Sequence, residues 1–479
     1  MKMETKRLSE VLRAFPAPEE EPIRRRLSAA QERNGSKIVV LDDDPTGIQT
    51  VHGVNVYTDW SFESVLEGFM EPGRMFYILT NSRSFSAERT RLVHAEIARN
   101  IWSASRRAGK EFILISRGDS TLRGHWPLET ETLREVLEEL SGQKIDGEII
   151  APFFREGNRY TVDDVHYAAD GDVLVPAGET EFAKDKTFGY KSSDLPGWME
   201  EKSGGKISRE EVCSITLKEL RACDTEGVER KLLAVHGFGK VAVNALDTCD
   251  IEVFCTALLG ALNRGHRFLL RTAAAVPKVL GGISDGPFLT REEMLCGETE
   301  RGGLVIVGSH VKKTSEQLEE LRQCGFVHFI EFNQHLVLQP ELLKNEITRV
   351  AVECGRRITG GKTVAVYTRR AILNLDSGSK EDELKISTRI SEAVTQIVKE
   401  LTVRPSFIIA KGGITSSDIG VKGLKVKRAL VLGQILPGVP VWRTGKESRF
   451  PGLPYVIFPG NVGGKTALAD AVRILTGKD

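Results

Sequence analysis

Three consecutive aspartates, Asp42, Asp43 and Asp44, stand directly after the short apolar run 38–41. Adjacent carboxylates repel one another and burial raises that cost, so three of them at the end of a strand are costly unless a function uses them. In open α/β sheets, ligands bind beyond the carboxyl ends of strands. The run therefore predicts an acid cluster that is catalytic or linked to Mg²⁺. The alternative is a solvated loop in which Asp44 or Thr46 caps a helix.

Arginines form the second group of candidate residues. Arg83 follows the apolar run 75–80, and Arg117 and Arg123 flank a short polar segment after the run 112–116. A guanidinium group binds a carboxylate through two parallel hydrogen bonds, and neighbouring Asp and Ser side chains can bind hydroxyl groups. The pattern therefore suits a small polyhydroxy acid. The alternative is an internal network of salt bridges and turns.

Glycine-bearing segments are the third candidate feature, and they lie in the second half of the chain. The segments 308–309, 412–413 and 460–464 each follow a short apolar run. Glycine lets backbone N–H groups approach a ligand without a Cβ in the way, and a helix N-terminus behind such a loop attracts phosphate. Three such segments predict a nucleotide site. It is not a standard P-loop, which would need glycine where the chain has Pro459.

Short apolar runs alternate with amphipathic stretches along most of the chain, and these elements must position the candidate residues. The alternation predicts an α/β protein whose mostly parallel sheets are flanked by helices and joined by right-handed crossovers. The carboxyl ends of parallel strands share one edge of a sheet, so the polar groups should gather there. The predicted strands are 38–41, 53–58, 75–80, 112–116, 148–151, 241–243, 268–272, 303–307, 363–367, 406–410 and 455–458, and the predicted helices are 87–107, 129–140, 251–262, 314–321, 384–401 and 466–475.

The length of 479 residues exceeds one ordinary hydrophobic core, which predicts more than one domain. The glycine- and proline-bearing stretch 276–302 is the predicted linker between a first domain at 37–275 and a second at 303–479. Residues 1–36 are charged and interrupted by prolines, which favours a surface helical extension that could serve as an oligomer arm in a homodimer. Residues 160–210 are rich in glycine, lysine and acids and are predicted to form loops, with a lid over the site as one interpretation.

The composition excludes several classes of function. The 66 basic and 66 acidic residues balance, so no overall charge favours nucleic acid as a partner. No apolar run is long enough to span a bilayer, and the first residues lack the apolar core of a signal peptide. Seven scattered cysteines, with no CxxC pair and no HExxH motif, argue against a structural zinc site and favour free thiols in a reducing cytoplasm.

Four motifs, taken together and in order, resemble those of the four-carbon acid sugar kinase family. Residues 43–47 fit its DDxTG signature, and residues 117–124 resemble its Lys-x-Asp-Ser-Thr-x-Arg-Gly segment. Residues 412–415 resemble its Gly-Gly-Glu-Thr, and residues 459–463 its Pro-Gly-Asn-Phe-Gly. The resemblance runs from about residue 37 to the C-terminus. Arg117 stands where the family usually has Lys, and Ile414 where it has Glu.

Members of that family are ATP-dependent kinases of threonate, erythronate and their oxo derivatives. The resemblance implies an α/β fold of two domains, one for the sugar acid and one for ATP, with the active site in the cleft between them and Mg²⁺ bridging the phosphates. It implies that the sugar acid contacts Asp43, Arg83, Arg117, Gly118, Asp119, Ser120 and Arg123. It implies that ATP contacts Ser309, Gly412, Gly413, Ile414, Thr415, Gly460, Asn461 and Gly463. Our hypothesis is that Asp43 or Asp44 is the catalytic base that accepts the hydroxyl proton.

Two alternatives stay open at this point. An NAD(P)-dependent hydroxy-acid dehydrogenase could use the same arginines and glycine-rich loops. Against it, no GxGxxG follows a predicted strand with an acid about twenty residues further on. A non-catalytic homologue that binds sugar acid and nucleotide is the other alternative, which the departures at Arg117 and Ile414 leave open.

Overall fold

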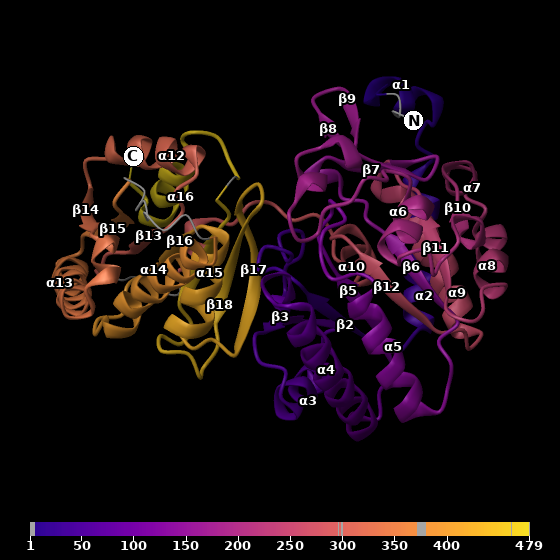
Figure 1. Cartoon of the computed structure of the whole chain (residues 1–479), viewed down its shortest axis with the longest axis horizontal. Coiled ribbons are helices and arrows are strands. Elements are labelled where there is room, and N and C mark those ends of the chain that lie inside the picture. The colour runs from indigo at the N-terminus through magenta and orange to yellow at the C-terminus, as the bar shows by residue number, and fades with distance from the viewer. Residues whose placement is uncertain (1–4, 296, 298–299, 371–379, 461, 479) are drawn as a thin grey trace. The chain divides into compact units, whose positions relative to one another are not determined.

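The computed structural model describes residues 5–295, 297, 300–370, 380–460 and 462–478 (Figure 1). The chain forms two compact units. The first comprises Met1–Gly47 with Asp59–Asp285, and the second Ile48–Thr58 with Gly286–Asp479. The sequence-based boundaries differ at residues 48–58, which they place in the first domain. These residues group with the second unit because strand β3 (Val54–Tyr57) pairs antiparallel with its strand β17 (Arg428–Leu436).

The first unit is built on a parallel sheet with the strand order β10-β11-β6-β12-β5-β2-β4. All six residues of β2 are buried, which is typical of a parallel strand covered on both faces. The strands are β2 (Lys37–Asp42), β4 (Met75–Leu79), β5 (Phe112–Arg117), β6 (Gly147–Ala151), β10 (Cys213–Ile215), β11 (Gly239–Val243) and β12 (Phe268–Thr272). The predicted α/β class with a mostly parallel sheet is confirmed.

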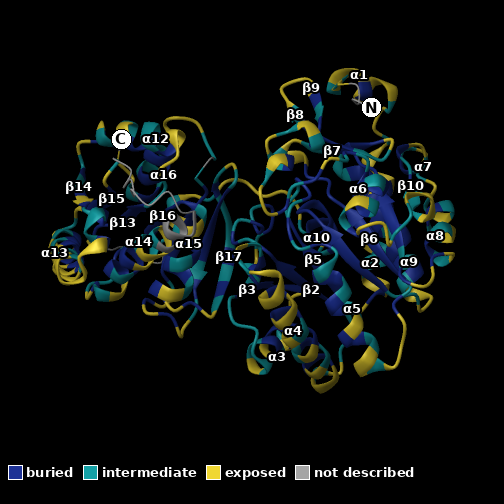
Figure 2. Cartoon of the chain, in the orientation of Figure 1, coloured by how far each residue is buried: buried dark blue, intermediate teal, exposed yellow. Residues whose placement is uncertain are grey.

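Amphipathic helices flank this sheet, with buried residues toward the strands and exposed residues outward (Figure 2). Helix α4 begins after Ser86, whose side chain accepts a hydrogen bond from the Arg89 N–H, and ends at Gly109 with φ +64°. The charged N-terminal residues form α2, which packs against α9. The helices of this unit are α1 (Leu8–Ala14), α2 (Glu20–Arg33), α3 (Phe62–Met70), α4 (Ala87–Ala108), α5 (Leu128–Ser141), α6 (Leu195–Lys202), α7 (Leu217–Arg221), α8 (Thr225–Leu233), α9 (Thr248–Asn263) and α10 (Ala275–Leu280).

The prediction of loops over residues 160–210 is wrong for residues 160–176, which form strands, and for residues 195–202, which form helix α6. Strands β7 (Arg159–Val162), β8 (Val165–Asp170) and β9 (Val173–Pro176) form a small antiparallel sheet, completed by β1 (Lys6–Arg7). The turn between β7 and β8 places two aspartates at positive φ, a conformation that tight hairpins require and that aspartate tolerates. Strands this short carry too little periodic pattern to be recognised among so many charged residues.

The second unit has the strand order β3-β17-β18-β19-β16-β13-β15-β14, in which the last five strands are mutually parallel. The sequence did not predict β14, the antiparallel pair β17 and β18, or helix α13. The strands are β13 (Leu304–Val307), β14 (Val327–Phe332), β15 (Thr363–Thr368), β16 (Ile408–Lys411), β17, β18 (Val439–Thr444) and β19 (Pro454–Phe458). The helices are α11 (Arg291–Met294), α12 (Lys312–Arg322), α13 (Pro340–Thr359), α14 (Lys380–Glu400), α15 (Gly413–Asp418) and α16 (Ala467–Thr476).

A contiguous apolar core holds the second unit together. It joins strand residues such as Val305, Ile409 and Val456 to the buried face of α16, including Leu468 and Val472. Within the described residues, no helix combines the length and apolar character needed to cross a membrane. The described cysteines are free thiols.

Candidate functional site

The acid cluster of the first unit lies at the carboxyl edge of the parallel sheet. Asp42 is the last residue of β2 and Arg117 the last of β5, and the strand register pairs these two positions. Their side chains meet at 3.3 Å between Arg117 Nη1 and Asp42 Oδ1. The parallel pairing therefore explains why a strand-end acid and a strand-end arginine lie together.

Asp43 and Arg83 form the central ion pair of the cluster. Arg83 lies in a short 3₁₀ turn after β4, and its Nε and Nη2 donate to Asp43 Oδ2 and Oδ1 at 3.2 and 2.6 Å. Its Nη1 lies 3.4 Å from Asp44 Oδ2 and 4.0 Å from Asp119 Oδ1. Although burial opposes the charge, these carboxylates raise the pKa of Arg83, so it stays a cation. One guanidinium group thus links three of the predicted residues.

Asp42 is buried under the loop that carries Asp43 and Asp44. Its side chain is buried, and burial raises its pKa to about 7 despite the neighbouring Arg117. A Cβ on Gly47 would lie 2.1 Å from Asp42 Oδ2, so the returning loop covers this carboxylate and requires glycine there. Asp42 is therefore a positioning residue beneath Asp43 and Asp44.

Asp44 is the most exposed carboxylate of the three. Its side chain is 26% exposed, compared with 3% for Asp43. It accepts hydrogen bonds from the backbone N–H and the hydroxyl of Thr46 at 2.8 and 2.5 Å. Burial opposes ionisation, but Arg83 and Thr46 outweigh it and lower the pKa of Asp44. Asp44 caps a turn and not the helix that the alternative interpretation expected, and it also presents an ionised carboxylate that is partly exposed to solvent.

The loop after β5 contributes a second ion pair. Arg123 Nε donates to Asp119 Oδ2 at 2.7 Å, and burial is outweighed by Arg83 and Arg123, which lower the pKa of Asp119. Arg123 also lies 3.7 Å from Asp185 and 5.2 Å from the ring of Phe182. Because Asp185 and Phe182 belong to the stretch predicted as loops or a lid, that stretch supplies one wall of the cluster. The carbonyl oxygen of Ser120 lies 2.7 Å from Nε2 of a buried histidine, His166.

Sequence reasoning missed a buried pair beneath this loop, Arg271 and Glu129. Arg271 Nη1 donates to Glu129 Oε2 at 3.2 Å, and Nη2 donates to the Arg123 carbonyl at 3.2 Å. A Cβ on Gly118 would lie 2.0 Å from Arg271 Cζ, so the loop rests directly on this guanidinium group. The available signal was a charged residue inside the predicted buried strand 268–272, where an arginine needs a partner.

The second unit brings glycine-bearing loops together around Ser309. They follow β13, β16 and β19, which are neighbours in the sheet. Gly412 has φ +124°, and a Cβ on it would lie 3.2 Å from Ser309 Cβ. A Cβ on Gly460 would lie 3.2 Å from Ser309 Oγ, and one on Gly308 would lie 2.4 Å from Thr415 Oγ1. The loops lie so close together that a Cβ on Gly308 would displace Thr415, and one on Gly412 would also be strained by the positive φ.

Helix α12 anchors these loops through side chains. Thr314 Oγ1 donates to the Gly460 carbonyl at 3.1 Å, and Gln317 Nε2 donates to the Val462 and Gly464 carbonyls at 3.0 and 2.8 Å. The helix begins at Lys312, so the predicted cap at residue 314 or 315 is wrong. Thr314 lies within the helix and holds a neighbouring loop instead.

Lys411 is a buried lysine behind the glycine loops. Its Nζ donates to the Pro459 carbonyl at 2.6 Å, and burial together with Lys313 lowers its pKa to about 7. Gly413 has open space where a Cβ would stand, and the side chain of Ile414 is 69% exposed. Gly463 has φ +83° next to Ala467. Asn461, which the resemblance implies in ATP binding, lies outside the described residues.

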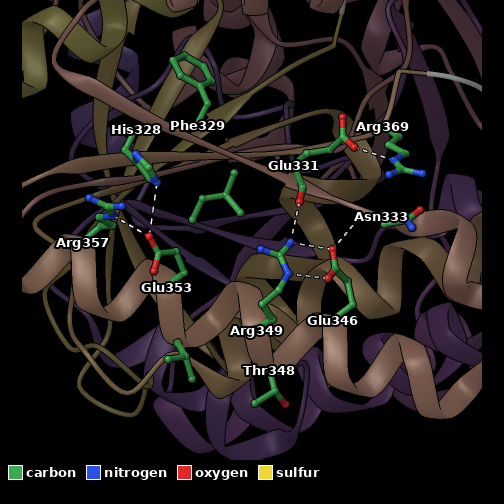
Figure 3. A pocket seen from close by; sticks show the side chains of 12 residues that line it. His328, Phe329, Glu331, Asn333, Glu346, Thr348, Arg349, Glu353, Arg357 and Arg369 are labelled. Atoms are coloured by element: carbon green, nitrogen blue, oxygen red, sulfur yellow. Dashed lines mark hydrogen bonds and ion pairs between the residues drawn. The ribbon is translucent and has the colours of Figure 1, made fainter.

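An open cavity of about 890 Å³ lies between β14 and α13 of the second unit (Figure 3). Its charged side chains pair with one another: Arg369 Nε with Glu331 at 2.6 Å, and Arg349 Nε with Glu346 at 2.7 Å. None of the predicted site residues lines it. The cavity therefore adds no candidate to the nucleotide site.

Comparison with known families agrees with the division of the chain into two units. Residues 38–280 match the model of a sugar-binding N-terminal domain, and residues 304–468 match that of a nucleotide-binding C-terminal domain. The chain therefore has one sugar-binding and one nucleotide-binding domain. The chain belongs to the four-carbon acid sugar kinase family.

Two solved structures share the fold at low sequence identity. A Haemophilus influenzae protein of the DUF1537 family is 17% identical, with 91% of this chain and 100% of that chain covered and a TM-score of 0.61. A Salmonella typhimurium LT2 protein, provisionally named a tRNA synthase, is 16% identical, with 91% and 98% covered and a TM-score of 0.65. No curated protein matches the chain.

Proposed function

We propose that this protein is an ATP-dependent kinase that phosphorylates a hydroxyl group of a four-carbon sugar acid, such as a threonate, an erythronate or an oxo-tetronate. The observation that carries the proposal is the aspartate and arginine cluster at the carboxyl edge of the sheet in the sugar-binding domain. This edge is where parallel sheets bind ligands, and the cluster combines anion-binding and proton-accepting groups.

The exposed arginines are the best candidates to bind the substrate carboxylate. Arg83 and Arg123 are 21% and 25% exposed, whereas Arg117 is 5% exposed and contacts Asp42. Each of these partly exposed guanidinium groups already contacts more than one aspartate, with Asp43 the main partner of Arg83 and Asp119 that of Arg123, but a guanidinium group has five N–H donors and can also bind a ligand. We therefore assign Arg83 and Arg123 to substrate binding and Arg117 to positioning.

Asp44 is the better of the two candidates for the catalytic base. Both oxygens of Asp43 accept hydrogen bonds from Arg83, and its side chain is nearly inaccessible. Asp44 is partly exposed and its lowered pKa keeps it ionised at neutral pH, so it can accept a proton from a substrate hydroxyl as the phosphoryl group is transferred. Asp43 then fixes the position of Arg83.

The loops around Ser309 are the proposed site of ATP. Nothing lies within 4 Å of a Cβ at Gly413, so phosphate oxygens can approach the backbone there, next to Gly412, whose own N–H donates to the Phe458 carbonyl at 2.8 Å. These loops contain no carboxylate, so Mg²⁺ would be held by the phosphates and by hydroxyl oxygen such as that of Ser309. Bound there, the ion would neutralise charge on the phosphates. Because the γ-phosphate and the substrate hydroxyl must meet for transfer, we propose that the domains close on both substrates during turnover.

A coupled ADP-release assay over a panel of threonates, erythronates and their oxo forms, with Mg²⁺ and ATP, tests the proposal. We expect ADP release with at least one member of the panel. Calorimetric binding of ATP and a sugar acid without ADP release would instead identify a non-catalytic homologue. A substrate-dependent change in nicotinamide absorbance, without ADP release, would identify a dehydrogenase.

A further inference from the structure

Two histidines and an aspartate meet at the amino end of the first unit's sheet, at the opposite edge from the acid cluster. Asp146 precedes β6, His236 precedes β11, and His266 precedes β12. The strand order β11-β6-β12 makes these three amino ends neighbours. Asp146 and His236 are 90 positions apart in the sequence, and His236 and His266 are 30 apart, so they form no local motif. This explains why the sequence analysis argued against a structural zinc site.

The distances between the donor atoms suit one metal ion. One ligand atom from each of the three residues lies within 4.8 Å of the others. The Nδ1 atoms of His236 and His266 lie 3.5 and 3.7 Å from the two oxygens of Asp146. Ligands bound at about 2.0–2.1 Å in a tetrahedral zinc site lie roughly 3.4 Å from one another. Only small side-chain movements therefore separate this arrangement from a coordinated one.

The surrounding structure holds two of the three ligands in place. The backbone N–H of Arg267 donates to Asp146 Oδ2 at 2.9 Å, and the ring of Phe268 stacks on that of His266 at 6.3 Å between centroids. Nδ1 of His266 is buried and has no hydrogen-bond partner, although it points toward the Asp146 carboxylate. A buried nitrogen without a partner is costly, and a metal ion would satisfy it.

The electrostatic setting also favours a cation. His266 follows the C-terminus of α9, and its backbone N–H donates to the Ala261 carbonyl at 3.2 Å. The negative end of the helix dipole and the charge of Asp146 both stabilise a positive ion at this point. The side chain of His236 is 68% exposed, so an ion can enter from solvent.

We propose that Asp146, His236 and His266 bind a divalent transition-metal ion of the zinc class, with solvent at the remaining coordination position. Two imidazoles and one carboxylate suit Zn²⁺, whereas Mg²⁺ prefers oxygen ligands throughout. The ion links the segments that precede three adjacent strands, so it stabilises the first unit. It takes no part in phosphoryl transfer, because it lies at the other end of the strands.

The experiment compares Zn²⁺ with Mg²⁺ on the full chain after treatment with a chelator. Isothermal titration is expected to show one equivalent of Zn²⁺ bound to the wild-type protein. A thermal melt is expected to show a higher melting temperature with Zn²⁺ and an unchanged one with Mg²⁺ alone. His236→Ala and His266→Ala should each weaken this binding at least tenfold. His328→Ala is the matched control, because His328 is also a partly exposed histidine beside a carboxylate, 3.6 Å from Glu353.

His236→Ala removes an exposed side chain, so it tests the proposal even if His266→Ala fails to fold. Saturable binding that is equal in the wild type, both variants and the control would overturn the proposal. The proposal would also be overturned if the wild-type protein bound no stoichiometric equivalent of Zn²⁺. The two histidines would then only form ion pairs with Asp146. Because sugar-acid and ATP assays use Mg²⁺, neither result bears on the proposed kinase activity.

Discussion

Both units place their candidate sites at the carboxyl edge of parallel strands, but the two sites are made of different chemical groups. In the first unit, ionised side chains at the strand ends form the site, and their partners are other side chains. In the second, closely approaching backbone loops form it, and helix α12 holds their carbonyl groups. The first site therefore depends on the charges of its side chains. The second depends on glycines, whose lack of a Cβ leaves room for the loops to lie close together.

This difference separates the kinds of substitution that each unit tolerates. An isosteric change of Asp to Asn leaves the shape of the first site and removes its charge. A change of Gly to Ala leaves every charge of the second site and fills its narrowest points. Variants of these two types distinguish proton acceptance and sugar-acid binding from nucleotide binding.

The largest effect is expected from Asp44→Asn. If Asp44 accepts the hydroxyl proton, kcat should fall by about 10³-fold, within the range of general base catalysis. Sugar-acid affinity should change little, because Arg83 remains held by Asp43. ADP release and calorimetry measure the two quantities. Asp170→Asn, at an exposed position on β8, is the control, and wild-type activity in Asp44→Asn would exclude this residue as the base.

Gly118→Ala should destabilise the first unit by about 3 kcal/mol, the upper part of the range for overpacking. The added Cβ would lie 2.0 Å from Arg271 Cζ, and the guanidinium group cannot move without losing Glu129. Chemical denaturation measures the change. Gly35→Ala serves as the control because nothing lies within 4 Å of the added Cβ. Equal stability of the two variants would show that Arg271 does not support the loop.

The pH dependence of stability should change in Asp42→Asn. The folded-state pKa of Asp42 is raised to about 7, above its unfolded value near 3.8, so the wild type loses stability as pH rises between these two values. The asparagine variant lacks this loss. Its stability relative to the wild type should therefore increase by on the order of 2 kcal/mol from pH 5 to pH 7, measured by urea denaturation. A constant difference would show that Asp42 is ionised across this range.

The smallest effect is expected from Gly412→Ala. The positive φ and the contact with Ser309 should weaken ATP binding about tenfold, a cost of the size expected for left-handed strain. Sugar-acid binding should be unchanged. Gly413→Ala is the adjacent control, with open space for a Cβ, and calorimetry compares the two. Equal ATP affinity in both variants would remove the loop after β16 from the nucleotide site.

Continuous apolar runs made the parallel strands predictable from sequence. The run 455–458 lies within β19, and 38–41 lies within β2, because strands buried on both faces show no polar alternation. Strand β14 was missed because His328 and Glu331 interrupt its apolar residues. The pair β17 and β18 was missed although both strands contain short apolar runs, 429–432 and 439–442. Helix α13 was missed although its residues are amphipathic.

Site residues that directly follow a strand could be predicted from the sequence. Site residues that lie within a strand or a helix could not. Asp43, Arg83 and Asp119 follow strand ends, and the parallel register brings them together. Arg271 and Glu129 lie within a strand and a helix, so their pairing depends on how the elements pack. The choice between internal salt bridges and substrate binding also could not be made from sequence, because the same arginines bind aspartates and keep donors for a ligand.

The most direct test of the kinase proposal is phosphorus NMR of a mixture of the protein, Mg²⁺, ATP and each four-carbon sugar acid. The proposal predicts that ATP disappears and that a new phosphomonoester signal grows with at least one acid, and that Asp44→Asn forms this product about 10³-fold more slowly. If calorimetry shows that ATP and a sugar acid both bind, and no phosphomonoester forms from any member of the panel, the account of phosphoryl transfer is contradicted.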